Sequence, residues 1–373
     1  MNKTLQKKKK KFFLKKQETR IDFGLLFLVI GLTLFGVLMI YNASVAEALR
    51  DFQNKYYYLK YQSLWAGLGL LLMMVISFFP YKLLAKLGPF FFFINLILLI
   101  AVLIPGVGMS IKGARRWLNL GIFVLQPTEL IKLTFTLYLS VWLSKSRSFW
   151  QFLLLIFIMI LLIMLEPDLG TTVVIAGIGF LIYYVSGASL IHLFPLALIG
   201  FLSGLLMIII SPYRKSRLTT FLNPSLDPLS TSYHIRQVLI ALGSGGIFGV
   251  GLGQSRQKYE YLPEAATDSI FAIIGEEIGF IGAVLVIIAL AIVVYKGFKI
   301  ASQTPDIFGK LLASGIAIWI GLQTIINIAA MVALIPLTGL PLPFISYGGS
   351  SLIIILIAMG ILLNISRFKV IEK

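Results

Sequence analysis

The sequence predicts an all-α integral membrane protein that folds as a single polytopic bundle of about ten transmembrane helices. Of its 373 residues, 58% are hydrophobic and only 13% are charged. Apolar runs of about 18 or more residues recur along the chain, and such a run lets a helix cross the roughly 30 Å hydrocarbon core of a bilayer. The connections between the runs are mostly short, which favours one bundle over separate domains.

Ten apolar runs are the predicted spans, and the tails outside them are polar. The first run has about 20 residues, more than the roughly 7 to 15 of a signal-peptide core, so we expect an uncleaved anchor. A membrane domain is predicted from 23 to 367, between a basic tail at 1–22 and a short tail at 368–373. The predicted spans are 23–44, 61–79, 83–104, 128–144, 149–165, 170–186, 189–211, 270–295, 310–335 and 345–366.

Lys and Arg are unevenly distributed between the connections. Nine of them lie in residues 1–22, and others recur in every second connection, as at Lys145 and Lys296. Cytoplasmic segments keep positive charge during insertion, so both termini are expected in the cytoplasm. The net charge of +17 is therefore ascribed to topology and to contact with anionic lipid rather than to nucleic-acid binding.

Two connections on the opposite, external side are long. Residues 105–127 combine glycine turns with three cations and Trp117. Residues 212–269 are too long for a simple connector, so we expect internal structure, including a short helix over Ser232–Ala241 that lies in the membrane interface. The glycine cluster 243–253 matches no nucleotide-binding loop and is interpreted as a flexible turn that lets the backbone approach a ligand or the membrane.

Familiar hydrolytic chemistry is disfavoured by composition. The chain has no Cys, its two histidines are His192 and His234, and it contains no GxSxG or HExxH motif. Disulfides, thiol chemistry, Ser–His catalysis and zinc sites are therefore not expected. Both histidines are interpreted as packing or interface residues.

Glu129 and Lys132 lie three residues apart in the fourth predicted span, so they share one helix face. Two interpretations remain open. The residues form a buried ion pair that fixes helix packing. Alternatively, they line a polar cavity in which Lys132 meets an anionic ligand.

Other charged residues lie where spans meet loops. Arg116 is placed outside the membrane, where a guanidinium suits a phosphate or pyrophosphate headgroup. Pro167 breaks the chain between the fifth and sixth spans, and Asp168 is placed either to cap the next helix or to bind substrate or metal. Glu276 and Glu277 lie inside the eighth span and are interpreted as a structural network.

Two polar segments are the strongest candidates for chemistry. Residues 259–279, YEYLPEAATDSIFAIIGEEIG, bring Asp268 to the membrane surface. Ionisable groups so near to hydrocarbon are energetically costly to keep, so Asp268 is interpreted as a functional residue. Residues 339–351, GLPLPFISYGGSS, offer hydroxyl groups and expose the N–H groups of Gly348 and Gly349 at a helix start, which suits an anion.

Five ordered motifs together resemble the SEDS family of bacterial cell-wall polymerases. Within the family, GLGQSRQK followed by YLPEA is more similar to the division-type members than to the elongation-type members. Ala266 and Ser269 stand where many members carry His and Phe, so contacts beside Asp268 are expected to differ. The motifs are GARRWLNLG with QPTELIK, EPDLGTT, YR..R...FLNP..DP, GLGQSRQK..YLPEAATDSIFAIIGEE and GLPLPFISYGGSS.

The resemblance implies a glycosyltransferase that polymerises lipid II into glycan strands and releases undecaprenyl pyrophosphate. The reaction is expected at the outer face of a bacterial cytoplasmic membrane, in septal wall synthesis. Asp268 is the implied general base of an inverting displacement. A class B penicillin-binding protein and other division proteins are the implied partners. An elongation-type polymerase, a lipid II flippase and a scaffold remain alternatives.

The motifs also predict a set of substrate-binding residues around Asp268. Arg116 and Lys132 are the leading cations for the leaving pyrophosphate. No metal ligand is assigned, although a divalent cation, Mg²⁺ or Mn²⁺, is an alternative that shares this role. The predicted substrate-binding residues are Arg116, Glu129, Lys132, Asp168, Lys258, Glu264, Thr267, Ser346 and Ser350.

Overall fold

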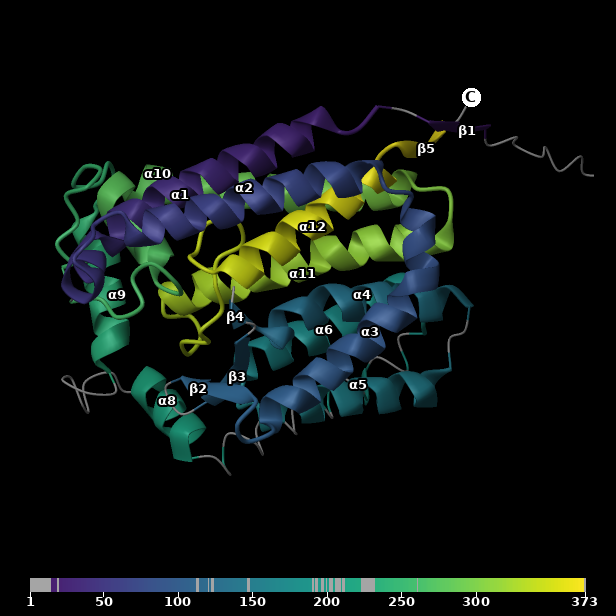
Figure 1. The fold of residues 1–373 in the computed structure, drawn as a ribbon, viewed down its shortest axis with the longest axis horizontal. Coiled ribbons are helices and arrows are strands. Elements are labelled where there is room, and N and C mark those ends of the chain that lie inside the picture. Colours follow the sequence, from purple (N-terminus) through teal and green to yellow (C-terminus); the bar gives the residue numbers. More distant parts are fainter. Residues whose placement is uncertain are drawn as a thin grey trace, which may run out of the picture.

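The computed structural model shows a bundle of long helices that run roughly side by side (Figure 1). Within the part of the chain that it describes, five helices are long and apolar enough to cross a membrane, and three shorter apolar helices accompany them. The prediction of an all-α polytopic membrane protein is therefore confirmed. The described residues are 15–18, 20–111, 114–119, 121, 124–145, 148–189, 191, 194–195, 198, 200, 204, 209, 212–222, 232–259 and 261–371.

Every predicted span except 189–211, which lies largely outside the described residues, coincides with a helix. The predicted ends at 44 and 295 are too early, because the first and eighth spans continue to Phe52 and Gln303. The predicted ends at 335 and 345 are also wrong, because the ninth span stops at Met331 and the last begins at Gly349. Three prolines between these points prevent a continuous helix. The helices are α1 (Phe23–Phe52), α2 (Tyr57–Phe78), α3 (Tyr81–Leu103), α4 (Pro127–Lys145), α5 (Phe149–Leu165), α6 (Leu169–Val185), α8 (Pro212–Leu222), α9 (Tyr233–Ser244), α10 (Ile270–Gln303), α11 (Ile307–Met331) and α12 (Gly349–Ile365).

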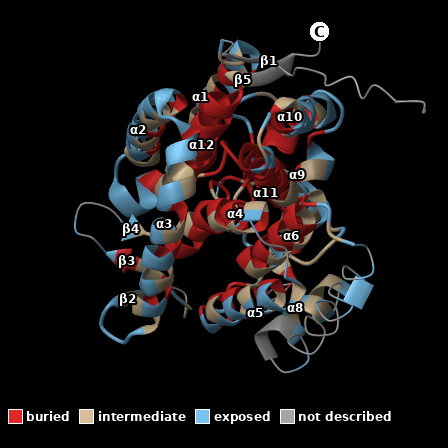
Figure 2. Ribbon diagram, turned by 90° about the vertical axis from the view of Figure 1, so that its right-hand side faces the viewer, coloured by how far each residue is buried: buried red, intermediate tan, exposed pale blue. Residues whose placement is uncertain are grey.

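Helix α11 is the centre of the bundle. In its most apolar 18-residue window 83% of the residues are buried, compared with 28% in α2 and in α3. Figure 2 shows the same contrast, with buried residues along α11 and α4 and exposed ones on the outer faces of α2 and α3. Because apolar side chains are favourable against lipid as well as against protein, the exposed Leu and Phe residues of the outer helices fit a membrane environment.

The two tails meet at one end of the bundle. Strand β1 (Lys15–Glu18) pairs antiparallel with β5 (Phe368–Ile371). Asp22 begins α1 as its N-cap, and its carboxylate also forms an ion pair with Lys296 of α10 at 2.8 Å. The termini therefore lie on the same side of the bundle, as an even number of spans requires.

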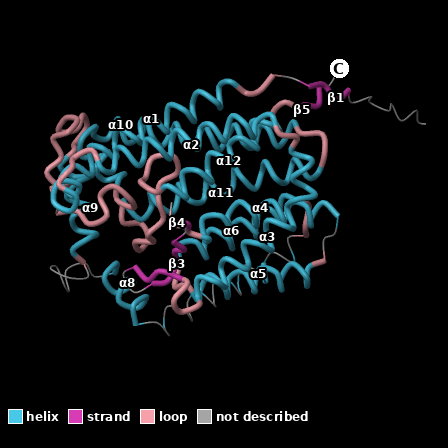
Figure 3. The backbone as a smooth tube through the Cα atoms, viewed as in Figure 1, coloured by secondary structure: helices cyan, strands magenta, loops and turns pink. Residues whose placement is uncertain are grey.

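A small antiparallel sheet lies at the opposite end and was not expected from the sequence. It orders β2 (Gly108–Ile111), β3 (Ala114–Asn119) and β4 (Val124–Leu125) as neighbours. Residues 105–127, which the sequence predicted as a loop, therefore contain a small sheet that precedes α4 in the chain. Figure 3 shows these strands at the end where the longer loops gather.

Residues 245–251 pack directly against a kink in α10 at Gly279, whose φ is +75°. Val250 N donates to Glu276 O at 3.0 Å, and Phe280 N donates to Gly246 O at 2.9 Å. A Cβ built on Gly249 would lie 2.2 Å from Glu277 O, so only glycine fits there. The glycine cluster therefore approaches another backbone. Its predicted approach to a ligand or membrane stays untested.

The short helix predicted over Ser232–Ala241 is confirmed as α9, which runs from Tyr233 to Ser244. It precedes the glycine segment and packs against α10. The long segment 212–269 therefore contains helical structure of its own.

Candidate functional site

The carboxylate of Asp268 is half-buried, in a turn just before α10. Asn327 of α11 donates through Nδ2 to the Asp268 carbonyl oxygen at 3.0 Å and to Leu340 O at 2.7 Å. One amide side chain thus joins the Asp268 segment to the loop that precedes α12. The backbone of Asp268 is therefore held from the protein interior.

The loop before α12 holds the neighbouring residues in the same way. Ser346 Oγ donates to Thr267 O at 2.6 Å, and it accepts from Leu342 N at 2.7 Å. Tyr347 N donates to Ala266 O at 2.9 Å. Because Ser346 is buried, its hydroxyl is engaged in structure rather than presented to solvent.

The side chains beside Asp268 form a local polar group. Thr267 Oγ1 donates to Glu264 Oε2 at 2.9 Å, and Glu264 adopts a left-handed backbone with φ of +53°. Across the turn, a Cβ built on Gly339 would lie 3.4 Å from Asp268 Oδ2. The absence of a side chain at Gly339 leaves space next to the carboxylate.

His234 of α9 contacts the residue that follows Asp268. Its Nε2 lies 2.7 Å from Ser269 Oγ, and Ser269 Oγ donates to Pro263 O at 3.1 Å. A serine hydroxyl has one hydrogen, so when that hydrogen goes to Pro263 the imidazole Nε2 must be the donor to Ser269. The imidazole is thereby oriented beside the Asp268 turn.

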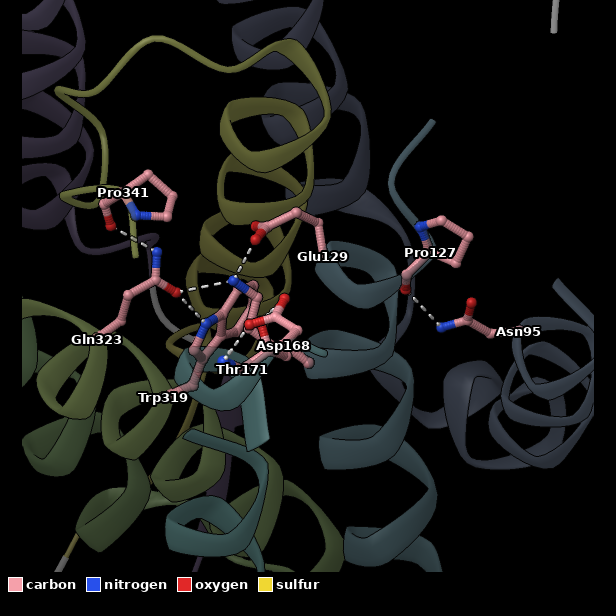
Figure 4. Close-up of polar contacts among 9 residues, drawn as sticks. Asn95, Pro127, Glu129, Asp168, Thr171, Trp319, Gln323 and Pro341 are labelled. Carbon is pink, nitrogen blue, oxygen red and sulfur yellow. Dashed lines mark hydrogen bonds and ion pairs between the residues drawn. The ribbon is translucent and has the colours of Figure 1, made fainter. Parts of the chain in front are cut away.

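Glu129 and Lys132 form a buried ion pair. This is the first of the two arrangements that the sequence left open for them. Lys132 Nζ lies 2.6 Å from Glu129 Oε1 and donates to Gln323 Oε1 at 3.0 Å, and neither member of the pair is more than 4% exposed. Trp319 Nε1 also donates to Gln323 Oε1, at 2.9 Å. On its other side, Gln323 Nε2 donates to Pro341 O at 2.8 Å (Figure 4). The pair is therefore linked through Gln323 to the loop that holds Asp268.

Arg116 and Asp168 organise the turn between α5 and α6. Arg116 donates through Nε to Glu166 O at 2.9 Å and through Nη2 to Pro167 O at 2.6 Å. Asp168 caps α6, since its carboxylate accepts from Thr171 N at 3.0 Å and from Thr171 Oγ1 at 2.8 Å. The capping interpretation of Asp168 is confirmed, and its predicted substrate role stays a prediction.

The Glu166 side chain in the same turn is fully buried, and neither of its carboxyl oxygens has a hydrogen-bond partner. Burial raises the pKa of Glu166 to about 8, and the nearby charge of Asp168 adds to the rise while Arg116 opposes it. At neutral pH this carboxyl is therefore mostly protonated.

Residues 337–341 connect the separate parts of the site. Arg217 of α8 donates to the Leu337 carbonyl oxygen at 2.6 Å. On α11, four residues apart, Asn327 donates to the Leu340 carbonyl oxygen and Gln323 donates to that of Pro341. The start of α6 packs against this segment, since a Cβ built on Gly170 would lie 2.9 Å from the Thr338 carbonyl oxygen. This segment therefore links α6, α8 and α11 beside the Asp268 turn.

Glu276 and Glu277 form the structural network that the sequence suggested. Ser255 Oγ donates to Glu276 Oε2 at 2.5 Å, and Arg256 N donates to Glu276 Oε1 at 3.0 Å. Lys258 Nζ pairs with Glu277 Oε1 at 3.1 Å and is 5% exposed. The Lys258 charge is thus matched inside the protein, and its predicted contact with substrate stays untested.

A cavity of about 230 Å³ lies beside the Asp268 turn, between α8, α9 and the start of the 337–341 segment. Its polar wall includes Arg217 and His234, while Phe221 and Ile235 contribute apolar surface. No acidic side chain occurs among its described lining residues, which are Ser216, Arg217, Thr220, Phe221, His234, Ile235, Pro336 and Leu337.

The structure brings some predicted site residues together and separates others. Thr267, next to Asp268 in the chain, bonds both Glu264 and Ser346, whereas Lys258 lies in the α10 network. Ser350, at the first turn of α12, donates to Val124 O of β4 at 3.0 Å. His192 lies outside the described residues. In the described part of the chain no group of three or more acidic or His side chains is placed to hold a metal ion.

Gln323 and Asn327 were not predicted. Both carry amide side chains in an otherwise apolar span, QTIIN, four residues apart and therefore on one helix face. Uncharged polar groups in a span need partners, so this spacing was a usable signal.

These features define a class: a polytopic membrane protein with a half-buried carboxylate at the end of the bundle opposite its termini. The carboxylate lies on a turn whose backbone is held by buried amide and hydroxyl groups. A family model described as cell cycle protein, which takes its name from FtsW, RodA and SpoVE, matches residues 23–371. The chain belongs to this family, as the resemblance of its motifs predicted.

Curated relatives and solved structures agree with this membership. The chain is 42% identical to stage V sporulation protein E of Bacillus subtilis, over 95% of this chain and 99% of that protein. It is 39% identical to the probable peptidoglycan glycosyltransferase FtsW of Trichlorobacter lovleyi, over 92% of this chain and 93% of that protein.

Among solved structures, a chain from a peptidoglycan synthase complex that coordinates polymerization and crosslinking superimposes with a TM-score of 0.76. It is 31% identical and covers 93% of this chain and 98% of its own. The rod shape determining protein RodA of Thermus thermophilus gives a TM-score of 0.67 at 30% identity, with coverage of 93% and 97%.

Proposed function

We propose that the protein is a peptidoglycan glycosyltransferase that polymerises lipid II at the outer face of the bacterial cytoplasmic membrane. Family membership and the names of its relatives support the activity. The observation that carries the proposal is the placement of Asp268: its backbone is bonded to Asn327, and its carboxylate is half-buried next to the open space at Gly339.

In the proposed reaction, Asp268 is the general base. Its carboxylate accepts the proton of the acceptor sugar 4-hydroxyl as that oxygen attacks the anomeric carbon of the donor. The bond from that carbon to the pyrophosphate oxygen breaks on the opposite face, so the configuration inverts. Hydrogen bonds from Asn327 and Ser346 to the backbone keep the base at one position, which lowers the cost of aligning the reactants.

The leaving pyrophosphate needs positive charge as it departs. Arg116 and Lys132 remain predicted for this role. In the resting structure both donate to protein groups, Arg116 to two carbonyl oxygens and Lys132 to Glu129 and Gln323. Contact with substrate would require them to exchange or share these partners.

Purified protein with labelled lipid II tests the proposal. We expect glycan polymer from the wild type and a loss of about 100-fold to 10,000-fold in rate for Asp268→Asn, which keeps the shape and removes the base. Translocation without polymer points to a flippase instead. Polymerisation by Asp268→Asn at the wild-type rate contradicts the assignment of the base and moves it to Glu264 or Asp168.

The cellular setting of the proposal is septal wall synthesis together with a transpeptidase of the class B penicillin-binding type. The division-type relatives and the solved synthase complex support this setting. The similarity to a sporulation protein and to RodA keeps a sporulation or elongation role as the alternative. Complementation of strains depleted of each kind of polymerase distinguishes these roles.

Both termini are proposed to be cytoplasmic. Reporter fusions at Lys145 and at Ser230 should report opposite sides of the membrane. A cytoplasmic signal from both would place Asp268 on the wrong side for a reaction at the outer face.

A further inference from the structure

A cluster of aromatic side chains lies where α1 ends and α2 begins, at the same end of the bundle as α9 (Figure 1). The ring of Tyr57 stacks on that of Phe52 with centroids 3.6 Å apart, and it lies 4.9 Å from Tyr61 and 5.5 Å from Tyr58. Tyr58 in turn contacts the ring of Tyr347 edge-on at 5.0 Å. The aromatic platform consists of Phe52, Tyr57, Tyr58, Tyr61 and Tyr347.

Tyr347 connects the aromatic platform to the turn that carries the candidate base. Its backbone N–H donates to Ala266 O at 2.9 Å, two residues before that base. Gln62, one turn after Tyr58 on α2, donates through Nε2 to Ser346 O at 3.4 Å. Residues four apart lie on one helix face, so the face of α2 that presents Tyr58 also holds the loop before α12. The platform is therefore fixed beside the candidate base.

Part of the aromatic platform is open to solvent. Phe52 and Tyr61 are 43% and 40% exposed, and both contact Tyr57. The face of an aromatic ring carries partial negative charge, and the C–H groups on one face of a pyranose ring carry partial positive charge, so a sugar stacks on an exposed aromatic face. Rings in contact with one another extend this surface beyond a single ring, which suits several linked sugars.

Hydrogen-bonding groups border the aromatic surface. Tyr58 Oη donates to Glu47 Oε1 at 3.1 Å. Burial raises the pKa of Tyr347 to about 12, so its hydroxyl keeps its proton at neutral pH. Tyr57, Tyr61 and Glu47 add to this rise, which places them near that hydroxyl. Carboxylate oxygens accept hydrogen bonds from sugar hydroxyls and tyrosine hydroxyls donate to sugar oxygens, so both needs of a carbohydrate ligand are met here.

A lipid-facing role explains the aromatic platform less well. Tyr residues do anchor helices at membrane surfaces. However, the segment that joins α1 to α2 carries an exposed ion pair between Arg50 and Asp51, followed by exposed Lys55. These charges place the neighbouring surface in water rather than in hydrocarbon. Because charges of both signs lie together there, the surface favours a neutral sugar over an anionic headgroup.

We propose that the aromatic platform binds the sugar rings of a glycan beside the Asp268 turn. This proposal rests on the proposed function, because that reaction supplies the glycan. Phe52 and Tyr61 stack on pyranose faces, and Glu47 accepts hydrogen bonds from sugar hydroxyls. The same chemistry suits two sources of sugar, which are the growing strand and the disaccharide of an incoming lipid II.

The test is a titration of the full-length protein, in lipid nanodiscs free of sugar-based detergent, with the soluble β-1,4-linked tetrasaccharide of N-acetylglucosamine. This probe has no lipid, phosphate or peptide, so only sugar recognition is measured. Tyr61→Leu and Phe52→Leu keep an apolar side chain and remove the ring, and each should raise the Kd about three- to tenfold. Tyr61→Phe keeps the ring and should change the Kd by less than about twofold.

Tyr56→Leu is the matched control. Tyr56 is also exposed and lies in the same segment, but its ring stacks on Tyr41 at 5.8 Å rather than on the aromatic platform. It should change the Kd by less than about twofold. Melting temperatures equal to that of the wild type show that the losses in Tyr61→Leu and Phe52→Leu come from the surface. Wild-type affinity in both of these variants overturns the proposal, as does an equal loss in Tyr56→Leu or a wild type that does not bind the tetrasaccharide.

Polymerisation of labelled lipid II by Tyr61→Leu distinguishes the two sources of sugar. Shorter strands at an unchanged initial rate mean that the aromatic platform holds the growing strand. A lower initial rate with unchanged strand length means that it holds the incoming disaccharide. Unchanged strands and rates overturn the proposal.

Asp268→Asn separates this proposal from the proposed function. It should bind the tetrasaccharide with the wild-type Kd and make no polymer. Should the wild type itself make no polymer, the proposed function fails, while the titration still decides whether the aromatic platform binds sugar.

Discussion

The side chain of Asn327 fixes the backbone of Asp268, with Asn327 Nδ2 3.0 Å from the Asp268 carbonyl oxygen. The same amide nitrogen bonds Leu340 O at 2.7 Å, and Asn327 is 1% exposed. The turn that carries the candidate base is therefore attached to α11, the most buried of the five helices that are long enough to cross a membrane. This arrangement gives the turn a fixed position that its own sequence does not provide.

Asn327→Ala removes the donor of both hydrogen bonds and leaves two carbonyls without it. We expect a loss of about 1 to 3 kcal/mol in stability, because buried groups lose their partner. The polymerisation rate should fall more than the affinity for lipid II, since the base shifts while the binding surface remains. Unfolding by denaturant and steady-state kinetics measure the two effects. A variant with the wild-type rate shows that the Asp268 turn is held adequately without Asn327.

The Glu129–Lys132 pair is tested by removing its members singly and together. Lys132→Met leaves Glu129 as an unmatched buried carboxylate and should cost about 3 to 5 kcal/mol, whereas Glu129→Gln with Lys132→Met should recover most of that loss. Because Lys132 remains predicted for the leaving pyrophosphate, we expect the double variant to recover stability without recovering polymerisation. A stable double variant that polymerises at the wild-type rate contradicts that role and supports a purely structural ion pair.

Glu166 predicts a pH dependence of stability. Its pKa is raised by burial from 4.5 in the unfolded chain to about 8 in the folded protein, so the folded state holds the proton more tightly. Stability should therefore fall as the pH rises from about 4.5 to about 8 and change little from this group above that range. Glu166→Gln, which cannot ionise, should weaken this decline and be more stable than the wild type at pH 8. Melting temperatures of both proteins between pH 5 and pH 9 measure it. Parallel curves for the two proteins contradict the shifted pKa.

Two glycines of the 243–253 cluster offer a matched comparison. A Cβ on Gly249 would lie 2.2 Å from Glu277 O, and its φ is +83°, so Gly249→Ala should cost at least about 2 kcal/mol through backbone displacement. Gly243→Ala meets nothing within 4 Å in the helix α9 and should be neutral or stabilising by up to about 1 kcal/mol. Thermal unfolding of the two variants gives the comparison. Similar stabilities mean that the contact with α10 is adaptable.

Much of the fold was predictable because its signals are local. In lipid, each span must satisfy its own backbone hydrogen bonds, so a long apolar run determines a helix wherever it occurs. The predicted spans, the capping by Asp168 and the short helix α9 depended on such signals. The small sheet β2–β4 did not, because strand pairing over a few residues has no comparably strong local pattern.

The sequence by itself determined the membrane bundle, the same-side termini and the segments that carry polar groups. Only the tertiary structure decided which of these groups meet. Lys132 is matched by Glu129, one turn away, and by Gln323, which lies 191 residues further along the chain. Arg217 and His234 reach one cavity because α8 and α9 pack against the start of the 337–341 segment. Contacts between distant residues depend on how helices pack, and helix packing is set by the shapes of whole surfaces rather than by the residues of one segment.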